Sequence, residues 1–182
     1  MSSSNNATFP RAPVRRFVDA NNFPDYGLSS FPLFSLGPVP KSTLEEISRT
    51  INEQTRDMLG FDVREYEELG LVIDIPENWD LSGKTVEEAV QDFFALMESD
   101  ERLPSGDPKW YPVSFVGVLQ KDWHNKGLVM AYLEDDKERG YLELKSCVVG
   151  SDRLGDSLIS LRQGDNYFDD EVQYIEDSGE RP

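Results

Sequence analysis

The sequence is short of basic side chains. Eighteen lysines and arginines stand against 35 aspartates and glutamates, so the 182 residues carry a formal net charge of −17. Proteins that hold nucleic-acid phosphates or anionic lipid headgroups need clustered lysine and arginine. We therefore expect no direct contact with nucleic acid and none with a membrane surface. A partner that is attracted by this charge would be a protein with a basic surface.

Cysteine and histidine each occur once, as Cys147 and His124. A single cysteine cannot form a disulfide within the chain, and one residue of each type cannot build a structural zinc site. A cysteine–histidine catalytic pair would require the two side chains to meet and the thiol to be exposed. Cys147 lies instead in a stretch with the pattern of a buried strand, and His124 in a stretch typical of a turn. We predict no catalytic residue, no metal site and no cofactor.

Long apolar runs are also absent. No window approaches the roughly 18 apolar residues that a membrane-spanning helix requires. The first six residues lack the positive charge and the apolar run of a signal peptide. We therefore expect a cytoplasmic protein.

Proline is concentrated in residues 1–40, which hold six of the eleven prolines and six of the twenty aromatic residues. This density of proline disfavours a regular helix or a central strand, and the aromatic content does not fit a solvated tail. We interpret residues 1–40 as an extended Pro/Phe-rich arm that lies in a groove, on its own domain or on another molecule. The aromatic residues expected to make partner contacts are Phe23, Tyr26, Phe31 and Phe34.

Hydrophobic periodicity after the arm indicates helices first and strands afterwards. A capping box at Ser42–Glu45 predicts a helix that stops at Gly60, and a second one at Thr85–Glu88 predicts a helix with a broad apolar face. Alternating apolar residues predict strands over 71–75, 113–119, 128–133 and 141–149.

The last part of the chain has weaker patterns. Leu154, Leu158 and Leu161 fit one helical face, although 157–161 also fits a strand, and 171–175 fits an edge strand. We predict an α+β fold with two amphipathic helices packed on an antiparallel β-meander, preceded by the arm. The globular domain is expected to span 41–164, and an acidic C-terminal segment to span 165–182.

A short motif, Gly83-Lys84-Thr85, matches the end of a phosphate-binding loop and lies between a predicted strand and a predicted helix. The full motif needs a glycine where this chain has Asn78, and acidic residues surround the helix start that a phosphate would use. We favour an ordinary helix cap.

Three tryptophans, Trp79, Trp110 and Trp123, lie near predicted turns or strand ends. Tryptophan is enriched at binding hot spots, but it also covers the edge of small cores. We favour the second role for each of them.

The acidic residues are not spread evenly. Residues 165–182 carry seven acids against one arginine, and only such clusters act over the screening length of about 8 Å in physiological salt. Within that segment Asp169, Asp170 and Glu171 are the expected partner contacts.

These features favour a non-enzymatic acidic protein, of the immunity-protein or phage-inhibitor type, that binds the basic surface of another protein, such as a nucleic-acid enzyme. The alternative is a structural or virion-associated assembly component whose arm docks on a neighbouring subunit and so drives self-association. An enzyme that acts on a small substrate is a third and less favoured interpretation.

Overall fold

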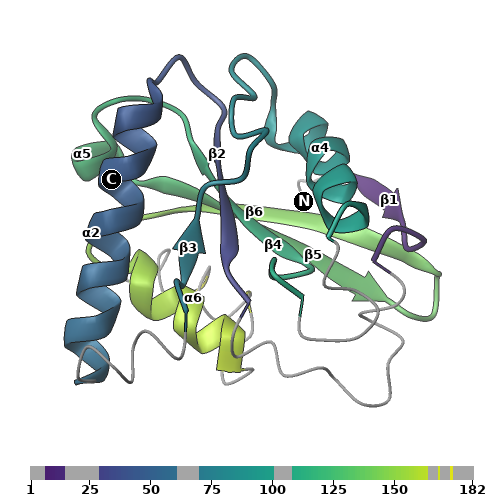
Figure 1. The fold of residues 1–182 in the computed structure, drawn as a ribbon. Helices are drawn as coiled ribbons and strands as arrows, with labels where there is room; N and C mark the ends of the chain where they lie inside the picture. The colour runs from purple at the N-terminus through teal and green to yellow at the C-terminus, as the bar shows by residue number, and fades with distance from the viewer. Residues whose placement is uncertain are drawn as a thin grey trace.

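The computed structural model describes residues 7–14, 29–60, 70–100, 108–163, 168 and 173. Helices and strands follow one another along the chain, and the strands form one mixed sheet, which gives an α+β fold (Figure 1). The elements are β1 (Thr8–Pro10), β2 (Phe31–Ser35), α2 (Lys41–Leu59), β3 (Ile73–Asp74), α4 (Val86–Glu98), β4 (Ser114–Val118), α5 (Trp123–Lys126), β5 (Leu128–Asp136), β6 (Tyr141–Val149) and α6 (Leu154–Gln163). None of the described helices is long and apolar enough to cross a bilayer.

The six strands form one sheet in the order β1-β6-β5-β4-β2-β3. Consecutive strands β4, β5 and β6 pair antiparallel, and β1 adds antiparallel to β6. Strand β2, however, runs parallel to both β4 and β3. The sheet is therefore mixed, which differs from the antiparallel β-meander that we predicted.

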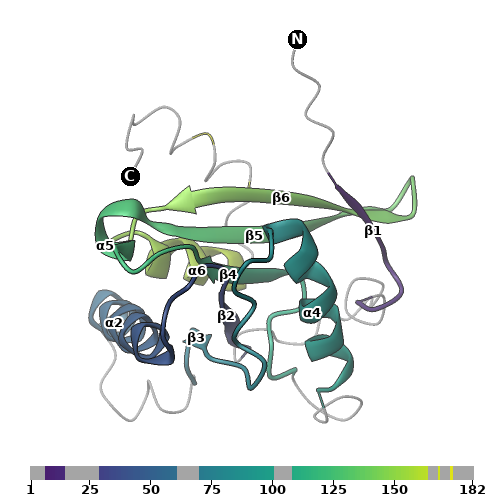
Figure 2. The same ribbon diagram turned by 90° about the horizontal axis from the view of Figure 1, so that it is seen from above.

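Helices cover both faces of the sheet. Apolar residues of α2 and α6 pack with one face, and those of α4 pack with the other together with Phe9 and Val14 of the N-terminal segment. Figures 1 and 2 show α2 and α6 on one side of β2 and α4 on the opposite side. Three helices of ten or more residues are thus present in the described part of the chain, where we had expected two.

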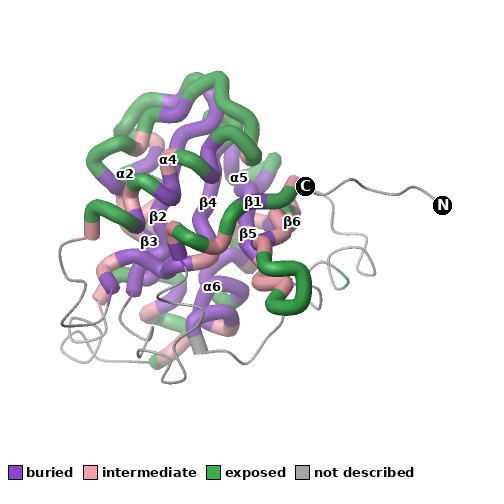
Figure 3. Tube along the Cα trace, turned by 90° about the vertical axis from the view of Figure 1, so that its right-hand side faces the viewer, coloured by how far each residue is buried: buried purple, intermediate pink, exposed green. Residues whose placement is uncertain are grey.

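Strand β2 lies inside the sheet, although the proline content of residues 1–40 had suggested an arm. Every residue of β2 is buried, and so is every residue of β4 (Figure 3). Pro32 is tolerated because its position falls between the isolated Ser30–Trp110 bridge and the ladder that begins at Leu33 and Val116. On its other side Pro32 is paired with Asp74 of β3, so the interruption concerns the β4 side alone, and the missing amide costs no hydrogen bond of the β2–β4 ladder.

The two predicted capping boxes had different outcomes. Thr85 caps α4 as expected: its hydroxyl accepts from the Glu88 amide, and the Glu88 carboxylate accepts from the Thr85 amide. The first helix begins two residues earlier than predicted, with Pro40 instead of Ser42 at its N-cap and no side-chain cap. Its C-terminal end agrees with the prediction, since Gly60 adopts a left-handed φ of 66°.

The remaining predictions differ in detail. The strand expected over 128–133 continues to Asp136, and the polar stretch before it forms the short helix α5 rather than a simple turn. Residues 154–163 are helical, which decides between the two alternatives for that region. The edge strand expected over 171–175 lies outside the continuously described residues.

Helix α2 also closes one edge of the sheet. Asn52, which is only 5% exposed, accepts hydrogen bonds from the amides of Val72 (2.8 Å) and Ile73 (3.3 Å) and donates one to the Ile73 carbonyl (2.8 Å). The Ser48 hydroxyl donates to the same carbonyl. These side chains occupy backbone groups that an added strand would need, so the described edge of β3 is not open for strand addition.

An ion pair between Arg11 and Asp135 connects the N-terminal segment 7–14 to β5. The Arg11 Nε and Nη2 donate to the two carboxylate oxygens of Asp135 at 2.6 and 2.9 Å, and the side chains are only 19% and 13% exposed. A bidentate, half-buried pair of this kind holds its geometry better than a surface pair.

We expect Arg11→Lys to lower the free energy of unfolding by about 1–2 kcal/mol, because an ammonium cannot reproduce the two-pronged contact. Urea unfolding of Arg11→Lys, Asp135→Asn and the double variant would measure the coupling energy between the two positions. Strictly additive effects would contradict the importance of this pair.

Candidate functional site

The predicted contact residues fall into two groups. Phe23, Tyr26, Asp169, Asp170 and Glu171 lie outside the described residues, so their roles stay predictions. Phe31 and Phe34 are fully buried in β2. Phe31 stacks on Tyr111 and Phe34 packs edge-to-face on Phe115. The prediction that these two rings contact a partner is corrected, because their own sheet and helices cover them.

Among the residues that the structure describes, the aspartates and glutamates are most concentrated between residues 70 and 100. This stretch, which we call the acidic segment, holds eight aspartates and glutamates and a single lysine. Residues 108–163, by contrast, hold eight acidic and eight basic side chains. The acidic segment runs from the edge strand β3, where Val72 and Ile73 pack with the α2 side of the core, through α4, which covers the other face of the sheet.

The packing of α4 explains why its acids face solvent. Its buried positions, Ala89, Val90, Phe93, Phe94 and Met97, all join the core on one face of the sheet. The polar positions between them therefore point away from the sheet. The exposed acids of the segment are Glu77, Asp80, Glu87, Glu88 and Glu98.

The Gly83-Lys84-Thr85 motif is a helix cap, as favoured from the sequence. The Lys84 Nζ lies 2.6 Å from the Asp92 carboxylate, and Glu88 already occupies the amide of Thr85. The lysine and the first free amide of α4 thus have partners within the chain, which leaves little for a phosphate to bind.

Asp80 lies in the turn before α4. The Ser82 hydroxyl donates to its carboxylate at 2.6 Å, and the Ser82 amide does so at 3.1 Å. The hydroxyl contact and then the amide contact lower the pKa of Asp80, because both stabilise the charged form. The charged form of this carboxylate is therefore favoured over that of an ordinary aspartate.

Replacement of Ser82 by alanine is expected to raise the pKa of Asp80 towards its ordinary value, since the larger of the two contacts is lost. The stabilisation due to this contact is present above the unfolded-state pKa and is lost as the pH falls through the lower folded-state pKa. A carbon-detected NMR titration of Asp80 would measure the shift. An unchanged pKa would show that the hydroxyl does not act on this carboxylate.

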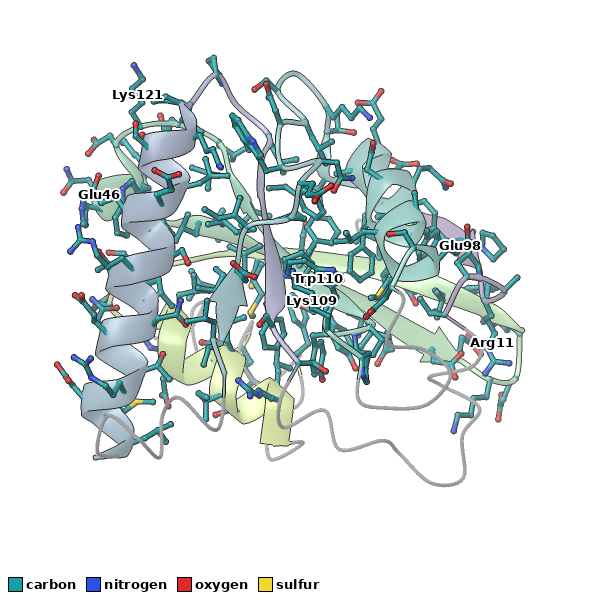
Figure 4. All side chains as sticks on the ribbon, viewed as in Figure 1. Arg11, Glu46, Glu98, Lys109, Trp110 and Lys121 are labelled. Atoms are coloured by element: carbon teal, nitrogen blue, oxygen red, sulfur yellow. The ribbon has the colours of Figure 1, made fainter. Side chains whose placement is uncertain are left out.

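A pocket with a volume of ≈ 710 Å³ opens in the acidic segment. It lies between the C-terminal half of α4, the turn after β3 and the two residues that precede the turn into β4. We call it the Trp110 pocket; its lining residues are Glu77, Asn78, Ala95, Leu96, Ser99, Asp100, Lys109 and Trp110. Figure 4 labels Lys109 and Trp110, which lie together, and Glu98 on α4.

The side chain of Lys109 covers the tryptophan in this pocket. Its Nζ lies 4.4 Å from the centre of the Trp110 ring and 3.7 Å from the Asp74 carboxylate. The Lys109 amide donates to the Asp100 carboxylate at 2.7 Å, and its carbonyl accepts from the Ser30 amide at 2.9 Å. The main chain of Lys109 is thus fixed from both sides, while its side chain is 42% exposed.

One residue of this site was interpreted correctly from the sequence. Trp110 was expected to cover the core, and its ring is indeed 4% exposed and packed with the residues of α4. The pocket itself was missed, because its walls come from segments that are distant in the sequence. The one sequence feature that points to this pocket is the excess of acidic over basic residues between residues 70 and 100.

A second pocket and the single cysteine and histidine were considered as alternative sites, and they offer fewer groups that could bind a ligand. A smaller pocket of ≈ 350 Å³ lies between α2 and β3, where Arg49 and Glu53 form an i,i+4 pair. Cys147 is half-buried against the core, while His124 lies 3.7 Å from Glu46 on the surface. Among the described residues, no group of three or more cysteine, histidine or acidic side chains could hold a metal ion.

Comparisons with known proteins give no relative. No protein-family model, no curated protein and no solved structure matches this chain.

Proposed function

We propose that this chain is a non-enzymatic acidic protein that docks on the basic surface of another protein, of the inhibitor type predicted from the sequence. The observation that carries the proposal is the acidic segment with its pocket. Eight acids and one lysine lie within the 31 residues that run from the edge strand β3 through α4.

Clustering is what makes this charge effective. A charge acts strongly only within about 8 Å at physiological ionic strength, so an even distribution over the surface would not guide a partner. A concentrated patch raises the rate of encounter with a surface of opposite charge. The cationic grooves of nucleic-acid enzymes have that character, which makes such enzymes the partner class that we propose.

The alternative, an assembly component with an exchanged arm, has less support. The described residues of the first 40 pair within their own chain: β1 adds to β6, and β2 lies between β3 and β4. Arm exchange would have to use other residues of that segment.

The proposal is tested by affinity capture from nuclease-treated lysate of the source organism. The bait is the intact chain, and the test variant replaces Glu77, Glu87 and Glu98 by glutamine. These three acids are exposed and belong to no hydrogen bond or ion pair among the described residues. The matched control replaces Glu45, Glu46 and Glu53 on α2, which removes the same charge elsewhere.

A basic protein that is recovered with the intact chain and with the α2 control, released by salt and lost with the test variant, is the expected result. Recovery of the chain alone, or of the same protein with all three baits, would contradict it. Sedimentation of the intact chain would then show whether self-association is its main activity.

A further inference from the structure

The Trp110 pocket has the features of a receptor for a single cationic side chain. The face of an indole ring attracts ammonium and guanidinium groups, and the attraction is strongest when the cation is withdrawn from water. Trp110 already holds such a group, since Lys109 lies over its ring. The ring is otherwise packed into the core beneath α4, so this cation occupies the side that faces the pocket.

The hold on Lys109 is weak. Its separation of 3.7 Å from the Asp74 carboxylate is too long for a good hydrogen bond, and both side chains are substantially exposed. The Lys109 side chain can therefore leave the ring at small cost. Its main chain would stay in place, because the amide and the carbonyl are bound by Asp100 and Ser30.

The walls of the pocket suit an incoming lysine or arginine. Glu77 and Asp100 supply negative charge, and Asn78 and Ser99 supply neutral hydrogen-bonding groups. Ala95 and Leu96 offer an apolar wall for the aliphatic part of the side chain. Glu77 forms no hydrogen bond or ion pair within the described residues and is exposed, so it can pair with an arriving cation.

We propose that the Trp110 pocket binds one lysine or arginine side chain of a basic protein partner, and that Lys109 is the internal cation which this side chain displaces. The inference rests on the proposed function, because it names the place where the basic partner is gripped. Removal of the internal cation should then strengthen binding more than removal of Lys84, the one lysine of the acidic segment.

The test uses the full chain and a synthetic peptide of nine arginines, with a nine-citrulline peptide of the same shape and no charge. Binding is followed by the indole N–H signals of the three tryptophans in ¹H–¹⁵N spectra, with Trp110→Phe used only to assign its signal. Lys109→Met keeps the length of the side chain and removes the charge. Lys84→Met is the matched control, since Lys84 also pairs with an acid of the acidic segment but does not line the pocket.

The expected result is a shift of the Trp110 signal with the arginine peptide alone. Lys109→Met should bind that peptide about five- to tenfold more tightly, which is the range of a cation–π contact, and Lys84→Met less than twofold. Glu77→Gln should weaken binding, whereas Glu98→Gln should have a smaller effect.

Three results would overturn the inference: no binding of the arginine peptide, binding that leaves the Trp110 signal unmoved, or equal gains for the two methionine variants. The proposed function is judged separately. If the Lys109→Met and Glu77→Gln variants capture a basic partner as well as the intact chain does, the Trp110 pocket is not where the partner binds, but the proposed function is retained. If no partner is captured while the peptide result holds, the function fails and the pocket remains.

Discussion

Gly37→Ala is expected to destabilise the protein by about 3–5 kcal/mol, a large part of an ordinary stability of roughly 5–15 kcal/mol. A Cβ atom on residue 37 would lie 1.7 Å from the carbonyl oxygen of Leu119 and 2.5 Å from its carbonyl carbon. Both atoms belong to the main chain, so no side-chain rotation can relieve the overlap.

The location of Gly37 makes the clash costly. The residue lies two positions after the end of β2, and its amide and that of Leu36 both donate to the Val118 carbonyl at 2.9 Å. These bonds hold the ends of the parallel strands β2 and β4 together. A shift that accommodated the methyl group would separate them, at the centre of the sheet.

Urea unfolding of Gly37→Ala measures the effect, with Gly140→Ala as the control. Gly140 has a left-handed φ of 74° and no atom near its missing Cβ, so only backbone strain of about 1 kcal/mol is expected there. Replacement of Leu119 by glycine in the Gly37→Ala background should give no rescue, because the clash is with the main chain. Equal losses for the two alanine variants would contradict the close approach of the strands.

Asn52→Leu is the second substitution with a large expected effect. The leucine side chain would leave the buried amides of Val72 and Ile73 without their acceptor. Each unsatisfied group costs about 1–3 kcal/mol, so we expect a loss of about 3–5 kcal/mol in total. The Ile73 carbonyl would lose less, since the Ser48 hydroxyl also donates to it.

Asn52→Asp distinguishes hydrogen bonding from packing, because the two side chains have nearly the same shape. The ionised carboxylate would face the Ile73 and Ser48 carbonyls, to which the amide now donates. Because the site is buried and two carbonyls face the charge, we expect the folded-state pKa of the introduced carboxyl to lie above its unfolded value, although the Val72 and Ile73 amides still donate to it. The penalty is therefore absent below the unfolded-state pKa and grows as the pH rises towards the folded-state pKa.

Chemical denaturation of Asn52→Asp and Asn52→Leu over a range of acidic to neutral pH would test this. Asn52→Asp should recover stability relative to the natural sequence as the pH falls, whereas the loss in Asn52→Leu should not depend on pH. Ser48→Ala, expected to cost less than about 1 kcal/mol, is the control for a shared contact. Parallel pH profiles for the two Asn52 variants would contradict the role of Asn52 as a cap on β3.

Sequence patterns located the elements that follow from local rules. The Thr85 capping box and the left-handed Gly60 are decided by neighbouring residues, so they could be predicted. The hairpin of β5 and β6 was also foreseen, since alternation and a polar turn are local features. These elements account for α2 and α4, which lie on opposite faces of the sheet, and for the β5–β6 hairpin.

The parallel half could not be predicted, because it depends on a contact between distant segments. The sequence around Pro32 disfavours a strand when it is considered alone. It becomes a strand because the ladder between β2 and β4 begins only after the proline and because core residues cover both faces of β2. The Trp110 pocket was missed for the same reason, since its walls are brought together only by the fold.

The measurement that tests the central claim most directly is the rate of association between the chain and its captured partner as a function of ionic strength. Stopped-flow fluorescence would compare the intact chain with the variant that lacks the charges of Glu77, Glu87 and Glu98. If acidic steering operates, the rate of the intact chain falls steeply with added salt, and the variant associates more slowly and with a shallower dependence. Identical rates for the two proteins at low ionic strength would contradict docking through the acidic segment.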